Sequence, residues 1–140
     1  MDPSAAIQII VLIILLFGSA FFSSAETSLT TVNRIKIRSL AEEGNKRAKM
    51  VIKITDDSSR MLSAILIGNN IVNLSASSLT TTIAYNLSNG ASAIAIATGI
   101  LTLLILIFGE ITPKTAATIH AEKLALSYAY PIRFIMVILT

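Results

Sequence analysis

The chain has 140 residues, of which 54% are hydrophobic and only 14% are charged, and its mean hydropathy is +0.76. A soluble domain of this length needs more polar residues to cover its surface, so the composition excludes that class and predicts a membrane protein. The net charge of +3 does not indicate nucleic-acid binding, because the basic residues gather in one segment between apolar runs. Cysteine is absent, which excludes disulfides and thiolate metal sites.

The first apolar run predicts a membrane-spanning helix over about residues 5–32, long enough to cross about 30 Å of hydrocarbon. A cleaved signal peptide is the alternative, because Ser23-Ser24-Ala25 offers small residues for cleavage. The segment before the run carries Asp2 and neither lysine nor arginine, which favours the spanning helix.

The segment 33–60 is rich in lysine and arginine, and the positive-inside rule places it in the cytoplasm. Its apolar residues recur at partly helical spacing, and Gly44-Asn45 supplies a break. This pattern predicts two short amphipathic helices on the inner membrane surface, with a plain solvated linker as the alternative.

Two further spans are predicted at about 61–85 and 92–112, joined by a short uncharged turn around Asn89-Gly90. Residues 113–140 then form a juxtamembrane segment that contains Lys123 and Arg133. The expected fold is an all-α membrane protein with three transmembrane helices, short amphipathic helices on the cytoplasmic side and a C-terminal juxtamembrane helix. The expected location is the cell membrane, multi-pass, with the N-terminus outside and the C-terminus cytoplasmic.

Each predicted span carries one polar cluster that lipid would not tolerate. In the first, Ser23 and Thr27 are four residues apart, as are Ser24 and Ser28, so their hydroxyls line one helix face with Glu26 at its edge. Close helix packing is the alternative for the serines. An acidic residue inside a span needs a function or a partner, and Glu26 is either functional or reaches toward Arg34 or Lys36.

The second cluster holds three amides within five residues. Asn69 and Asn73 are one helical turn apart, and Asn70 lies three residues before Asn73. Interhelical hydrogen bonding is the alternative, but it contributes only about 0.6 kcal/mol per pair on average. The density of amides therefore favours cation ligation or pore lining.

The third cluster combines a proline with a glycine and a carboxylate. Pro113 has no N–H, so in a continuous helix the Gly109 carbonyl loses its intrahelical partner and is free to bind an ion beside Glu110. A simple proline kink with Glu110 paired to Lys114 is the alternative.

The oxygens of these clusters are hard ligands that suit Mg²⁺, Ca²⁺ or Na⁺ rather than zinc or copper. His120, the single histidine, lies outside the clusters. One or two carboxylates among neutral oxygens would hold an ion weakly enough to release it. We therefore expect ion transport and no enzymatic activity.

At the three clusters the segments FFSSAETSL, IGNNIVN and FGEITPKT occur in this order, with the basic segment between the first two. In these motifs the chain resembles the transmembrane (DUF21) domain of the CorC/CNNM magnesium transporters. The resemblance implies a homodimer, and in full-length members cytoplasmic CBS modules that bind ATP, which this chain does not contain. It also implies that residues 128–140 lie along the membrane rather than cross it.

The resemblance further implies that each protomer binds a dehydrated Mg²⁺ and exports it in exchange for Na⁺. Carried over by motif, the metal ligands are Ser23, Ser24, Asn69, Asn70, Asn73, Gly109 and Glu110. Glu26 is our candidate for Na⁺ coupling. The expected partners are membrane lipid and a second copy of the chain, and the alternative function is a Mg²⁺-sensing module that moves no ion.

Overall fold

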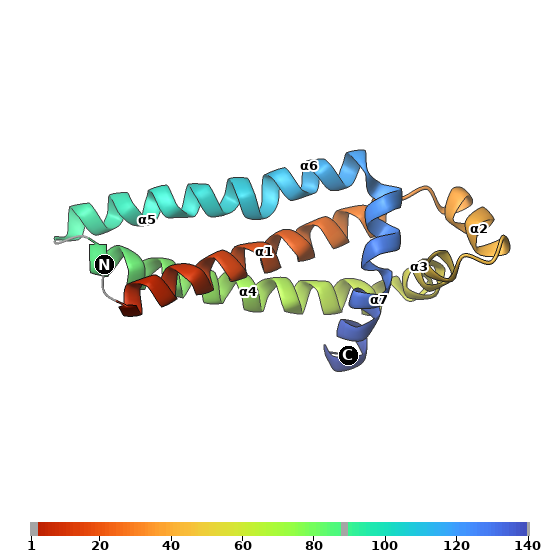
Figure 1. Ribbon diagram of the computed structural model, residues 1–140, viewed down its shortest axis with the longest axis horizontal. Helices are drawn as coiled ribbons and strands as arrows, with labels where there is room; N and C mark the ends of the chain where they lie inside the picture. Colours follow the sequence, from red (N-terminus) through yellow and green to blue (C-terminus); the bar gives the residue numbers. More distant parts are fainter. Residues whose placement is uncertain (1–2, 88–89, 140) are drawn as a thin grey trace.

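The computed structural model describes residues 3–87 and 90–139, and within these ranges it is helical throughout except for short breaks. Three long segments lie side by side in Figure 1: α1 (Pro3–Thr31), α4 (Ser58–Leu87), and a third segment made of α5 (Ala91–Leu106), a π-helical turn (Ile107–Ile111) and α6 (Thr112–Ile119). The predicted all-α fold is therefore confirmed. Of the predicted turn, Asn89 lies outside the described residues.

The described residues contain three helices that are long and apolar enough to cross a membrane, over Ala6–Thr31, Ser58–Tyr85 and Ile94–Ile119. Few side chains along these spans are buried within the chain, as expected for helices whose surfaces face lipid. The third span continues to Ile119, beyond the end predicted near residue 112. A proline removes one helical hydrogen bond and crowds the preceding turn, and the π-helical turn just before Pro113 accommodates it without ending the helix.

Two short helices follow the first span, α2 (Arg34–Glu42) and α3 (Lys46–Asp56), as the periodicity of the basic segment predicted. Asn33 caps α2, because its side chain accepts hydrogen bonds from the backbone N–H groups of Ile35 and Lys36. Gly44 ends the first of these helices in the left-handed region at φ 96°, and Asn45 caps the next. The Gly44-Asn45 pair thus sets the break between the two helices.

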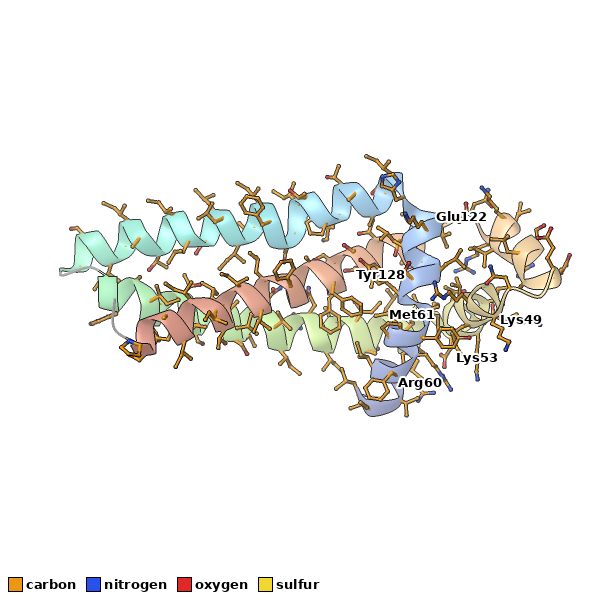
Figure 2. All side chains as sticks on the ribbon, in the orientation of Figure 1. Lys49, Lys53, Arg60, Met61, Glu122 and Tyr128 are labelled. Atoms are coloured by element: carbon orange, nitrogen blue, oxygen red, sulfur yellow. The ribbon has the colours of Figure 1, made fainter. Side chains whose placement is uncertain are left out.

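The last helix, α7 (Ala121–Leu139), crosses the end of the bundle at a steep angle (Figure 1). We call this end, where α2, α3 and α7 gather, the basic end, and the opposite end, where α4 stops and α5 starts, the far end. Figure 2 shows Lys49, Lys53 and Arg60 near α7 at the basic end. An ion pair of 2.8 Å between Lys36 and Glu122 joins α2 to α7.

The buried apolar core lies at the basic end, where α1, α2, α3, α4 and α7 meet. Alanines at the helix crossings allow the backbones to approach closely. The ring of Phe21 packs edge-on against Tyr128, with ring centroids 5.1 Å apart, and this contact fixes α7 to α1. The core residues with almost no exposed surface include Ala25, Leu29, Ile37, Ala48, Val51, Ile54, Met61, Ala64, Ile65, Ala125, Ala129, Ile132 and Met136.

Candidate ion site between the three spans

Polar groups from the three spans meet near the middle of the bundle, and the first span contributes Ser19 rather than a residue of its predicted cluster. The hydroxyl of Ser19 on α1 donates to Asn73 Oδ1 on α4 at 3.0 Å. Asn73 Nδ2 in turn donates to Glu110 Oε1, in the π-helical turn, at 3.2 Å. Since these three residues come from three different spans, their hydrogen bonds join all three at one height.

Gly109 brings a backbone oxygen to the same place. Its carbonyl accepts a hydrogen bond from Ser19 Oγ at 3.4 Å, and Pro113 offers no N–H to that carbonyl. A Cβ at position 109 would lie 3.1 Å from Leu16 Cδ1 and 3.3 Å from Ser19 Oγ, so any larger residue would require these side chains to shift, and glycine allows the third span to approach α1 without such a shift. The Gly109 carbonyl and the Glu110 carboxylate thus belong to one hydrogen-bonded cluster, linked through Ser19 and Asn73.

One turn closer to the basic end, two polar atoms lack partners. Ser23 Oγ and Asn69 Oδ1 are both buried, and neither forms a hydrogen bond with the described residues. Helices α1 and α4 run antiparallel, because Gly18 contacts Val72 and Gly68 contacts Phe22, and this register places Ser23 and Asn69 at the same height. Buried polar groups are usually satisfied, so two such oxygens at one level point to a missing ligand.

The other predicted residues take different positions. Ser24 is buried and donates to the Pro113 carbonyl at 3.4 Å, which ties α1 to α6. Asn70 is exposed on the outer side of α4, so the structure does not bring it to the cluster. Glu26 is half-buried, two turns from Ser19 toward the basic end, and its carboxylate has no ion-pair partner among the described residues.

Ser19 is a member of the cluster that the sequence analysis missed. It is buried, with 1% of its surface exposed, and it bonds to both other spans. The signal was present, because Ser19 lies four residues before Ser23 and extends the Ser23–Thr27 stripe by one turn.

Glu110 supplies the negative charge of the cluster. Among the described residues it forms no ion pair with Lys114 and instead accepts a hydrogen bond from Asn73. No group of three or more acidic or histidine side chains able to hold a metal occurs in the described part of the chain. Any cation held here would therefore meet one carboxylate and otherwise neutral oxygens.

A cavity of about 200 Å³ opens beside Glu110, between α4 and α5. Its polar lining comes from Asn73, Ser77, Thr80 and Thr102 in addition to Glu110, and its apolar lining from Ala76, Ile105 and Leu106. The cavity runs from the cluster toward the far end.

The chain matches the model of the CNNM family, described as the cyclin M transmembrane N-terminal domain, over residues 10–140. It is 45% identical over 141 residues to a UPF0053 protein of Haemophilus influenzae, covering 94% of this chain and 33% of that protein. It is 44% identical over 118 residues to the UPF0053 inner membrane protein YfjD of Escherichia coli, covering 84% of this chain and 26% of the relative.

The chain is also similar to a chloroplastic DUF21 domain-containing protein of Arabidopsis thaliana, with 39% identity over 132 residues, covering 94% of this chain and 20% of that protein. A more distant relative, the polyamine export protein of Haemophilus influenzae, is 30% identical over 140 residues, covering 91% of this chain and 32% of its own length. The chain thus spans about a third or less of the length of these relatives.

Proposed function

Because this chain belongs to the CNNM family of membrane proteins, we propose that it is the membrane-embedded part of a magnesium transporter, with its ion site at the meeting point of the three spans. The observation that carries the proposal is the convergence of Ser19, Asn73, Gly109 and Glu110. Intramembrane carboxylates and amides are costly and usually mark an ion path.

The donors suit Mg²⁺ in kind. Mg²⁺ prefers six oxygens in octahedral geometry. The hydrogen-bonded cluster supplies four oxygen-bearing groups, and the unpartnered Ser23 Oγ and Asn69 Oδ1 offer two further oxygens one turn away. No sulfur ligand is available, which disfavours soft metals.

The charge of the site favours release as well as binding. One carboxylate leaves a net charge of +1 when a divalent ion is bound and zero when Na⁺ is bound. Because uncompensated charge at membrane depth is costly, Na⁺ is a natural competitor for the same oxygens. We therefore propose Na⁺-coupled export, with half-buried Glu26 as the second cation-attracting group on the path from the basic end.

The lysines and arginines of α2 and α3 support an orientation in which the basic end faces the cytoplasm. A cysteine placed at exposed Lys53 should then resist an impermeant thiol reagent applied to intact cells and react after permeabilisation. Labelling of this cysteine in intact cells would show that the basic end faces outward instead. We also propose that the functional unit is a homodimer, which cross-linking of the full-length protein in membranes would test.

The transport test uses proteoliposomes that contain the full-length protein and an internal Mg²⁺ indicator. Glu110→Ala and Asn73→Ala should each abolish most Mg²⁺ flux, whereas Ser78→Ala, on the exposed side of α4, should keep it. Normal Mg²⁺ flux and normal Mg²⁺ affinity in both site variants would refute the proposed ion site. Ion binding without flux in the wild type would instead favour a sensing module.

Organic polycations are a second candidate cargo, since the relative from Haemophilus influenzae is named a polyamine export protein. The observation that favours this cargo is the apolar side of the cavity, where Ile105 and Leu106 border a single carboxylate, Glu110. A primary ammonium would pair with that carboxylate while its methylenes contact the two side chains. Flux of spermidine, with Mg²⁺ unable to compete, would favour this cargo over Mg²⁺.

A further inference from the structure

The half of α4 nearer the far end is rich in hydroxyl groups that the ion site itself does not explain. Asn73, Ala76, Ser77 and Thr80 follow one another at helical spacing and form one stripe that lines the cavity. Across the cavity, Thr102, Ile105, Leu106 and Glu110 form the facing stripe of the third span. Because α4 and α5 are antiparallel neighbours, Asn73 lies near Glu110 at one end and Thr80 faces Thr102 at the other.

The cavity thus leads away from the carboxylate. Thr80 lies seven residues beyond Asn73, and Thr102 lies eight residues before Glu110. At a rise of 1.5 Å per residue, the hydroxyls of these threonines are about 11 Å further toward the far end than the ion site. A path of this length covers most of the distance from the bilayer midplane to its surface, which is about 15 Å.

The polar lining is available to a ligand. The hydroxyls of Ser77 and Thr102 form no hydrogen bond with any described residue. Thr80 is 2% exposed and donates to the Ala76 carbonyl at 2.7 Å, which leaves the lone pairs of its oxygen free to accept. Thr102 is also an unusual residue for α5, whose remaining residues between 99 and 106 are glycine, leucine and isoleucine.

We propose that this cavity is an outer vestibule that holds the transported cation with part of its water shell between Glu110 and the far end. The inference rests on the proposed transport function and deepens it. At about 30 Å³ per water molecule, a cavity of about 200 Å³ takes about seven waters, enough for most of the shell that Mg²⁺ sheds reluctantly. The hydroxyls would form hydrogen bonds with the waters, and the Glu110 carboxylate would attract cations from the far end toward the ion site.

The vestibule predicts a pattern of chemical access that single cysteines can measure, because residues 1–140 contain no native cysteine; any cysteine elsewhere in the full-length protein is first replaced by serine. Single cysteines at Ser77 and Thr102 of the full-length protein in liposomes should react with an impermeant cationic methanethiosulfonate. Ser75→Cys and Leu104→Cys are matched controls, since each lies at nearly the same depth on a face turned away from the cavity. These two controls should react slowly.

The same variants report the charge preference of the cavity. The cationic reagent should modify Ser77→Cys roughly tenfold or more faster than an anionic reagent of similar size, because of the nearby carboxylate. Adding Glu110→Gln should remove most of that ratio without changing the rate at which a third, uncharged methanethiosulfonate modifies Ser77→Cys. The vestibule would be refuted by equal rates for the cationic and anionic reagents. It would also be refuted if Ser77→Cys and Thr102→Cys did not react, and that result would indicate that a lipid chain or a second copy fills the cavity.

Isosteric variants connect the vestibule to flux. Thr80→Val and Thr102→Val remove a hydroxyl at nearly constant shape, and each should slow maximal Mg²⁺ flux about fivefold, the factor expected for one lost hydrogen bond to the water shell. The Mg²⁺ concentration for half-maximal binding should not change. Faster flux in these variants would instead indicate an alkyl chain in the cavity. If the wild type moves no ion while the labelling pattern holds, the transport proposal fails, and the cavity remains only as a water-filled pocket that attracts cations.

Discussion

Replacing Ser19 with alanine separates a packing role from an ion-binding role at the centre of the site. The wild-type hydroxyl donates to Asn73 Oδ1 at 3.0 Å and contacts the Gly109 carbonyl at 3.4 Å. Hydrogen bonds between membrane helices contribute about 0.6 kcal/mol on average and at most about 1.7 kcal/mol. The ion-free variant should therefore lose only about 1 kcal/mol of stability, because the second contact is long.

The effect on Mg²⁺ binding should be larger. A hydroxyl that contacts a charged group contributes about 2 kcal/mol, so its loss should weaken binding about thirtyfold. At a Mg²⁺ concentration about a hundred times the wild-type Kd, the ion adds about 2.7 kcal/mol to wild-type stability but only about 0.9 kcal/mol to that of the variant.

Thermal unfolding of the purified protein with and without Mg²⁺ measures both quantities. Ser28→Ala is the matched control, because Ser28 is equally buried on α1 but donates to the Ala25 carbonyl of its own helix at 3.3 Å. A Ser19→Ala protein that keeps the full Mg²⁺-induced stabilisation would refute the assignment of Ser19 as a ligand.

Three further substitutions test other parts of the site. Asn70→Ala should keep Mg²⁺ flux within about twofold of wild type, whereas Asn73→Ala should lose it, because only Asn73 faces the cluster; equal losses in the flux assay would contradict the structure. Gly68→Ala would place a Cβ 2.4 Å from the Phe22 ring and should cost about 1–3 kcal/mol in thermal unfolding by forcing α1 and α4 apart; an unchanged midpoint would show that the ring moves freely. Glu26→Ala should reduce the dependence of Mg²⁺ flux on an inward Na⁺ gradient, and flux that keeps its full Na⁺ dependence would remove Glu26 from the coupling step.

Much of the fold follows from the sequence because the bilayer restricts what a long apolar run can do. The spans are set by run length, and the Gly44-Asn45 break is set by one left-handed glycine and one cap. The hydrogen bond between Asn73 and Glu110 was also predictable, since polar groups within lipid need partners from the protein itself.

The remaining features depend on the angular position of each residue about its helix, which the sequence does not specify. Asn69, Asn70 and Asn73 are alike in type, yet only the packing of α4 on α1 turns Asn70 outward. Ser19 stands between Gly18 and Ala20, where a small residue is equally typical of plain helix packing. The π-helical turn before Pro113 was not predicted either, because proline indicates a disturbance of the helix without specifying its form.

The hydrogen bonds of the site also bear on how the proposed ion would leave it. Ser19 donates to Asn73 Oδ1, and Asn73 Nδ2 donates to Glu110 Oε1, so a chain of two hydrogen bonds ends at the carboxylate and stabilises its charge. A cation must displace these hydrogens before it can contact the same oxygens. Breaking the hydrogen bonds among Ser19, Asn73 and Glu110 thus lowers the net free energy of ion binding. The same bonds form again when the ion is released. Because these internal hydrogen bonds compete with the ion, the site would bind the ion more weakly than its oxygens alone would allow. Repeated transport requires such moderate affinity.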